Sequence, residues 1–449
     1  MKLFRVVLTI TVASFLVVTS LLITGTSAVA DPGDELDAIF FEAKVASARP
    51  AGTSPRATAL DFEVLAHVDP GAGTTGDVFG YRGHAYLGSW VGIGCLSKGV
   101  RVYDLQNPRD PRLASTFADK ASDPSVANTW TEKTVVQHVN TPFFKGDLAA
   151  VSFQTCGRRL DPTVFRGFGL YDVSDPAHPT KLALYATEPG VNNGSHEIWL
   201  QNVGDRAYVY TAIPLSELRT TKAKADFRII DVTDPRHPVQ VGQWGAWKEL
   251  GIHPLTGLGP NPRSFVHSVI VNEQATLAFL SYWDTGTVIL DISDPTAPRF
   301  LGRTTFVGSE QGNAHSAAIA RGDGLLVETR EAFEGIPVFF DVTDPTRPTR
   351  LAAYANAAFM ALDTVHDPKI RGSLTYLSYY DVGIVALDSS RPASPRLVAQ
   401  FRPDPTGLPI NPDFFCTVSC VVFWGVFVDR DYVLGSDMNG GLWVLKIRG

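Results

Sequence analysis

Five of the chain's ten histidines recur at one place in a repeated pattern, each 10 to 12 residues before the centre of a strand-like run. They are His138, His196, His267, His315 and His366. Neutral imidazole is a common ligand of transition metals, and three or four converging ring nitrogens would suit zinc, iron or copper. The sequence therefore predicts a metal cluster, provided that the fold brings these segments together.

Two other interpretations of the same histidines stay open. A histidine that recurs once per repeat can be structural, bonded to a turn aspartate or to a backbone carbonyl, or it can contact a ligand without metal. Serine-type catalysis is not supported, because the chain has no G-x-S-x-G motif, and a phosphate-binding loop is absent as well. Acid–base candidates near the histidine segments are Glu197, Asp284, Glu328, Glu331, Asp367 and Asp437.

Aromatic residues in the same segments indicate a ligand surface. We predict that Trp244, Trp283 and Trp424 contact the ligand, the alternative being that they are buried between repeats. Long connections follow or precede these segments, and long loops on one face of a rigid scaffold are where binding usually occurs. They are residues 156–168, 213–227, 243–264 and 402–415.

A six-fold repeat must position these side chains. Each copy is a short apolar run that ends in Asp and is followed by a proline-containing turn. The Asp carboxylate can accept backbone N–H groups, and proline starts the turn and then the next strand. The copies are Gly99–Pro111, Gly167–Pro179, Asp226–Pro238, Gly286–Pro298, Ile336–Pro348 and Gly383–Pro395, with a truncated seventh at Gly441–Ile447.

Four strand-like runs per repeat, repeated along the chain, predict an all-β fold, a seven-bladed β-propeller over residues 60–449. The last copy stops after its third strand, and Phe62–Val68 resembles an outer strand. We expect this N-terminal strand to complete the last blade and close the ring. The first strand of each blade would line the central channel, with the histidines around one mouth.

The phrase "apolar run–Asp-Val-Ser/Thr-Asp-Pro-x-x-Pro", as in Gly167–Pro179 and Asp226–Pro238, resembles the LVIVD repeat family of bacterial and archaeal surface proteins. The resemblance covers roughly residues 60–449. It implies export and a propeller fold, but it implies no particular activity.

The N-terminus reads as a targeting segment. Residues 1–30 combine Lys2 and Arg5, an apolar run and Ala28-Val29-Ala30, which is typical of a signal peptide, although an uncleaved membrane anchor is the alternative. Residues 31–59 are rich in Ala, Pro, Ser and Gly and predict a flexible linker. We therefore expect a secreted or cell-surface protein that contacts a membrane only through this segment, if at all.

Cysteines and charge narrow the class further. Four cysteines in an exported chain indicate two disulfides, and we favour Cys95–Cys156 and Cys416–Cys420. The net charge of −7 argues against a nucleic-acid partner.

Together these patterns favour an exported propeller that binds a protein or small molecule at the loop-rich face around its channel. The alternative is a metal-dependent oxidoreductase or hydrolase that uses the histidine cluster.

Overall fold

The computed structural model describes residues 59–60, 62–69, 71, 73–90, 95–96, 98–156, 161–308, 312–320, 322–332, 335–356, 364–404 and 421–448. All of them belong to one compact unit, residues 41–449. The predicted signal peptide, almost all of the predicted linker, and Cys416 and Cys420 lie outside the described residues. Within the described part of the chain, no helix combines the length and the apolar character of a membrane span.

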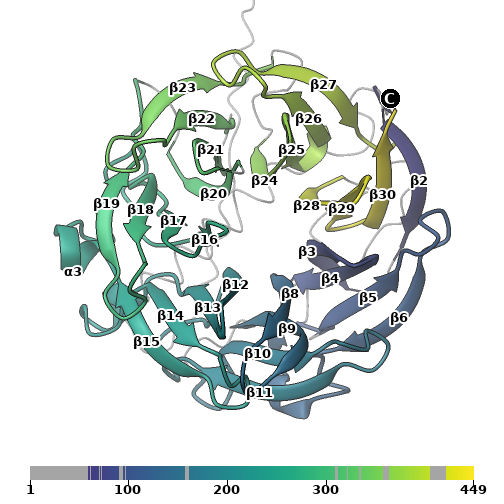
Figure 1. Ribbon diagram of the computed structural model, residues 1–449, viewed down its shortest axis with the longest axis horizontal. Helices are drawn as coiled ribbons and strands as arrows, with labels where there is room; N and C mark the ends of the chain where they lie inside the picture. Colours follow the sequence, from purple (N-terminus) through teal and green to yellow (C-terminus); the bar gives the residue numbers. More distant parts are fainter. Residues whose placement is uncertain are drawn as a thin grey trace, which may run out of the picture. The chain divides into compact units, whose positions relative to one another are not determined.

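The described chain is all-β, and its strands form seven small antiparallel sheets arranged around a central axis (Figure 1). The prediction of a seven-bladed β-propeller is confirmed. Numbered along the chain, the first three blades are β3 (Thr74–Tyr81), β4 (His84–Trp90), β5 (Val100–Asp104) and β6 (Arg112–Phe117); β8 (Thr134–Asn140), β9 (Lys145–Thr155), β10 (Gly167–Asp172) and β11 (Thr180–Ala186); and β12 (Ile198–Val203), β13 (Arg206–Ala212), β14 (Phe227–Asp231) and β15 (Val239–Trp244).

The fourth, fifth and sixth blades follow the same order from the axis outward. They are β16 (Ser268–Val271), β17 (Leu277–Ser281), β18 (Thr287–Asp291) and β19 (Arg299–Arg303); β20 (Ala314–Ile319), β21 (Leu325–Arg330), β22 (Val338–Asp341) and β23 (Thr349–Ala353); and β24 (Val365–Arg371), β25 (Leu374–Tyr379), β26 (Gly383–Asp388) and β27 (Arg396–Phe401). Short additions are β1 (Ala59–Leu60), β7 (Thr129–Trp130), the 3-10 turns η1 (Pro124–Val126) and η2 (Tyr380–Val382), and the helices α2 (Ser216–Arg219) and α3 (Ala246–Leu250).

The two ends of the chain build the seventh blade together. β28 (Phe423–Asp429), β29 (Tyr432–Asp437) and β30 (Gly441–Ile447) supply its three inner strands, and β2 (Phe62–Val68) pairs with β30 as the outer strand. Closure by the N-terminal strand, as predicted, leaves the ring without a long open edge.

The repeated motif forms the turn between the third and fourth strands of six blades. In every copy the first Asp accepts a backbone N–H two residues later, for example Ser293 to Asp291 at 2.9 Å and Thr343 to Asp341 at 2.9 Å. Each fourth strand then pairs with the third across a register shift, as between Ile289 and Leu290. The conspicuous aspartates are therefore turn residues, on the face opposite the starts of the first strands.

Candidate functional site

Local irregularities turn two successive residues of the inner strands toward the axis. Register shifts occur at the start of β3, β20, β24 and β28, where one residue (β20, β28) or two residues (β3, β24) lie outside the regular ladder. Such bulges redirect side chains. In β20, His315 contacts histidines of both neighbouring blades, while the next residue, Ser316, lines a central cavity. The inner wall therefore carries two layers of side chains near this face.

The first layer is a closed ring of six buried side chains, which we call the girdle. Its members are Glu132, His196, His267, His315, His366 and Trp424. Consecutive ring centroids from His196 to Trp424 lie 3.9 to 4.2 Å apart. Trp424 Nε1 donates to Glu132 Oε1 at 2.7 Å, and the other carboxylate oxygen of Glu132 lies 3.1 Å from His196 Nδ1, which closes the circle.

Backbone carbonyls determine which nitrogen of two girdle histidines carries hydrogen. His267 Nδ1 lies 3.1 Å from the carbonyl oxygen of His315, and His315 Nδ1 lies 3.1 Å from that of His366. A carbonyl oxygen only accepts, so both Nδ1 atoms donate. When these imidazoles are neutral, each Nε2 then presents a lone pair. Metal-binding histidines commonly have this arrangement, because a backbone carbonyl accepts from the nitrogen that does not bind the metal.

Glu331 completes a potential metal-binding set with these two histidines. One ligand atom each from His267, His315 and Glu331 lies within 4.8 Å of the others, and all three residues are buried. His315 Nε2 is 3.5 Å from Glu331 Oε2, while the phenol of Tyr380 donates to Glu331 Oε1. Two imidazoles and one carboxylate form the ligand set of hydrolytic zinc sites and of non-haem iron oxygenases.

His196 extends this set on the neighbouring blade. Its Nε2 lies 2.7 Å from His267 Nε2, and its Nδ1 lies 2.7 Å from Gln154 Oε1. His196 Nδ1 faces the oxygens of Gln154 and Glu132, so it also donates. A hydrogen between the two Nε2 atoms therefore requires one of the two rings to be protonated on both nitrogens.

The sequence placed His138 in this group, but the structure does not bring it there. His138 lies near the end of β8, 43% exposed, with its Nδ1 2.8 Å from Asp147 Oδ1. The residue of the second blade that corresponds to His366 is Glu132. In both blades the next residue, Lys133 or Asp367, donates its backbone N–H to a serine hydroxyl of the second strand. The hairpin of the second blade is longer, so a constant spacing from the second strand points to the wrong residue.

The three predicted ligand-binding tryptophans are all buried. Trp244 packs edge-on to Tyr282 between the third and fourth blades, within their shared core. Trp283 stacks on Phe265 and lies 5.4 Å from the His267 ring, and Trp424 belongs to the girdle itself. Trp283 and Trp424 therefore flank the histidines, whereas Trp244 is a core residue.

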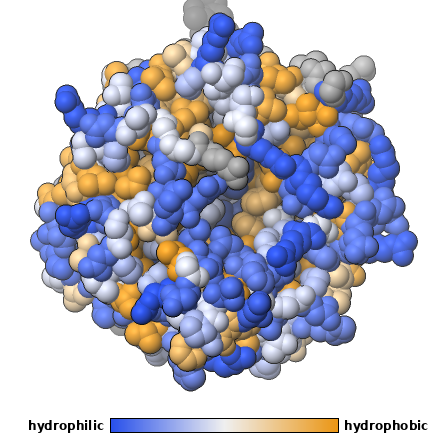
Figure 2. Space-filling model, in the orientation of Figure 1, coloured by the Kyte–Doolittle hydropathy of each residue, from blue (hydrophilic) through white to orange (hydrophobic). Residues whose placement is uncertain are grey.

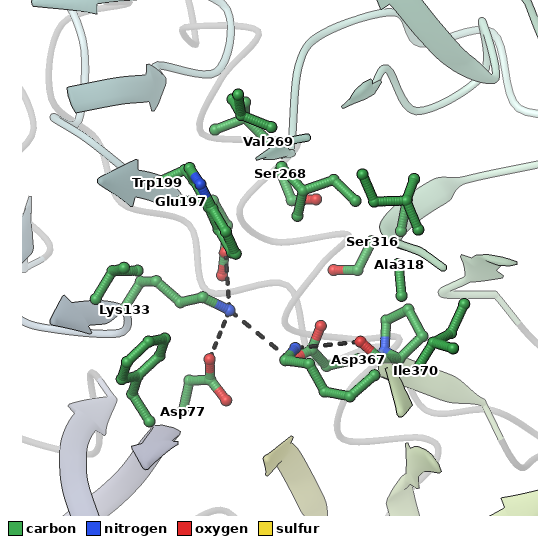
Figure 3. Close-up of a pocket in the computed structure, with 18 residues that line it drawn as sticks. Asp77, Lys133, Glu197, Trp199, Ser268, Val269, Ser316, Ala318, Asp367 and Ile370 are labelled. Carbon is green, nitrogen blue, oxygen red and sulfur yellow. Dashed lines mark hydrogen bonds and ion pairs between the residues drawn. The ribbon is translucent and has the colours of Figure 1, made fainter. Parts of the chain in front are cut away.

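The second layer is formed by the residues that directly follow the girdle residues in the chain. It contains an ion cluster around Lys133. Lys133 Nζ lies 2.5 Å from Asp77, 3.1 Å from Glu197 and 3.8 Å from Asp367, on the inner strands or strand starts of four different blades (Figure 3). Lys369 also pairs with Asp367. Burial raises the pKa of Asp77 and that of Glu197, the latter to about 7. Burial alone would lower the pKa of Lys133, but the three carboxylates raise it well above its ordinary value.

Sequence reasoning missed Glu132 and Lys133. One signal was available. In the second blade Lys133 N–H donates to Ser152 of the second strand, as Asp367 N–H donates to Ser378 in the sixth blade, so Glu132-Lys133 corresponds to His366-Asp367. That signal depends on knowing the hairpin length.

A disulfide joins Cys95 and Cys156, with the Cα atoms 5.7 Å apart. It links the first and second blades on the girdle side, and this part of the cysteine prediction is confirmed. The predicted Cys416–Cys420 pair lies outside the described residues.

Comparison with known proteins places the repeat but no activity. A search of curated proteins finds no match. Among solved structures, the computationally designed Ika8 protein is 8% identical, with 86% of this chain and 100% of that chain covered and a TM-score of 0.48, a similarity too low to carry an argument. Residues 276–305, which span β17, β18, the motif turn and β19, match the LVIVD repeat. The chain is therefore a β-propeller that contains an LVIVD repeat.

Proposed function

We propose that this protein is an exported β-propeller that binds one transition metal ion at His267, His315 and Glu331, as a metal-dependent oxidoreductase or hydrolase. The proposal rests on one observation, the convergence of three buried ligand atoms within 4.8 Å. This is the metal-dependent enzyme that the sequence suggested as the alternative function. The proposal adds Glu331, which directly follows β21, as a carboxylate ligand.

The distances and hydrogen bonds fit this ion. Ligands bound at about 2.0–2.2 Å to one centre lie roughly 3 Å or more from each other, and the 3.5 Å between His315 and Glu331 agrees with that spacing. The carbonyl-bound Nδ1 atoms aim each Nε2 inward. Three protein ligands leave coordination positions open, where the ion could polarise a substrate or exchange electrons.

The neighbouring side chains have separate tasks in this proposal. Tyr380 donates to Glu331 and so orients its carboxylate. His196, when protonated on both nitrogens, would donate a hydrogen bond from Nε2 to a species bound beside His267. Trp283 and Trp424 pack beside the histidine rings and limit access of water.

Metal analysis tests the proposal. Protein purified without chelators should contain about one equivalent of iron, zinc or copper, and His267→Ala, His315→Ala and Glu331→Gln should lose it. His138→Ala is the matched control, since it removes a histidine far from the set and should keep the metal. Protein that stays metal-free after incubation with each ion, while folded by thermal denaturation, would contradict the proposal.

Export is supported by the N-terminal pattern and by the Cys95–Cys156 disulfide, which is typical of oxidising compartments. Mass spectrometry of protein from the producing cell should find a mature N-terminus at Asp31. An intact Met1 N-terminus on membrane-bound protein would instead indicate the uncleaved anchor.

A further inference from the structure

The central channel contains a cavity on the side of the second layer that faces away from the girdle. Its volume is about 180 Å³, and it extends along the inner strands of the first six blades toward the face of the motif turns. The centre of the face in Figure 2 is hollowed, with hydrophilic residues gathered around it. The cavity exists because the fourth and fifth blades contribute small side chains, Ser268, Ser316, Ala317 and Ala318, where other blades contribute large ones.

One end of the cavity is polar and, when its carboxyl groups are ionised, contains more negative than positive groups. Among its described lining residues, three carboxylates, of Asp77, Glu197 and Asp367, face two ammonium groups, of Lys133 and Lys369. Every one of the three carboxylates is at least nine-tenths buried. Both lysines are already paired with these carboxylates, so the polar end has spare acceptor capacity and no spare cation.

Ser268 supplies an independent sign of a missing partner. Its side chain lines the cavity opposite the ion cluster and is only 4% exposed (Figure 3). Among the described residues, no hydrogen bond to its hydroxyl is found, whereas the hydroxyl of Ser316 lies 2.9 Å from His315 Nδ1. Buried hydroxyls are normally hydrogen-bonded, so Ser268 is placed to bond a molecule in the cavity.

The rest of the wall is apolar and includes an indole. Phe79, Val135, Trp199, Ile270 and Ile370 line it, and Figure 3 shows Trp199 beside Glu197. A cavity of about 150 Å³ with apolar walls accommodates benzene. A volume of about 180 Å³ therefore accommodates a benzene-sized body with a short polar arm.

We propose that this cavity binds a small primary ammonium compound with a compact apolar body. The ammonium group would donate to Glu197 and to Ser268, and the apolar body would pack against Trp199 and Ile270. An anion would have to remove Lys133 from its carboxylates and leave them unpaired in a buried site, which is costly. A neutral alcohol would fill the same space without supplying the missing positive charge.

Calorimetric titration of the chelator-treated protein tests this inference with three probes of one shape: benzylamine, benzyl alcohol and benzoate. Benzylamine should bind at least about tenfold more tightly than the other two, because hydrogen bonds to charged groups are the stronger ones. Equal affinity for benzyl alcohol, preference for benzoate, or no binding of any probe would overturn the proposal.

Variants separate the charge from the space. Glu197→Gln should weaken benzylamine binding by about 10- to 100-fold. Ala318→Leu fills the cavity while leaving every charge in place, and it should abolish binding even if Glu197→Gln does not fold. Glu63→Gln, on the outer strand β2, is the matched control and should bind normally.

The metal proposal and this one fail separately. His267→Ala should lose metal yet keep its affinity for benzylamine. Benzylamine binding that disappears with His267→Ala, or that survives Ala318→Leu, would place the amine elsewhere and refute the cavity site.

Discussion

Replacing Lys133 with methionine should destabilise the propeller more than any surface lysine change. The ammonium group lies within 4 Å of Asp77, Glu197 and Asp367, and it is the cation nearest to the first two among the described residues. Methionine has a similar length but no charge, so the variant leaves buried carboxylates without their partner. Removing one member of a buried ion pair typically costs about 3–5 kcal/mol. We expect a loss of that size in the free energy of unfolding.

Urea denaturation at pH 7, followed by tryptophan fluorescence, measures this loss. Lys446→Met is the control, because Lys446 pairs with Asp431 at the exposed surface, and its removal should be within experimental error. Adding Asp77→Asn to Lys133→Met removes one uncompensated carboxylate and should restore part of the stability. If Lys133→Met resembles Lys446→Met, or if the double variant is no more stable than Lys133→Met, the ion cluster does not hold the blades as described.

Three further predictions concern groups away from the channel. Burial raises the pKa of Asp226 to about 8, so the protonated form favours folding and the free energy of unfolding falls as pH rises from about 4 to 8. Asp226→Asn removes this loss, and its stability relative to the wild type should rise by up to about 5 kcal/mol across that range. Denaturation at several pH values measures the difference. Cys156→Ser opens a loop of 61 residues and should cost about 4 kcal/mol, and reduction of the wild type should lower its thermal midpoint as well. Asp291→Ala removes one turn hydrogen bond and an exposed ion pair with Arg299, and it should cost about 1 kcal/mol in urea denaturation, with the fold retained by circular dichroism.

The fold was predictable because its signal is periodic and local. Each copy of the motif encodes a buried strand, an Asx turn and an edge strand, and these depend only on neighbouring residues, as the hydrogen bond to Asp291 illustrates. Ring closure was predictable for a related reason. The truncated last copy lacks a fourth strand, and Phe62–Val68 has the pattern of one. Neither inference needed the distance between remote segments.

The candidate site was predictable only in part, because it depends on register. Four of the five predicted histidines converge, since the hairpins that follow them have nearly equal lengths. His138 was misplaced because the second blade has a longer hairpin, and the same error hid Glu132 and Lys133. Glu331 was one of several loop carboxylates in the sequence. Its value as a ligand arises from the position of β21's end beside His315.

The chemistry of this propeller lies in the departures from its repeat. If every blade carried histidine and a large neighbour, the channel would be filled and symmetric. Instead, the first blade has Gly76 in the first layer, and the seventh has Gly425 in the second, where an added Cβ would lie 1.9 Å from Asp77 Oδ1. That glycine lets Asp77 reach toward Lys133. The small residues of the fourth and fifth blades leave the cavity open on the opposite side. Asymmetry among nearly equal blades therefore separates a histidine-rich layer, where we propose a metal site, from a charged chamber, where we propose a small-molecule site.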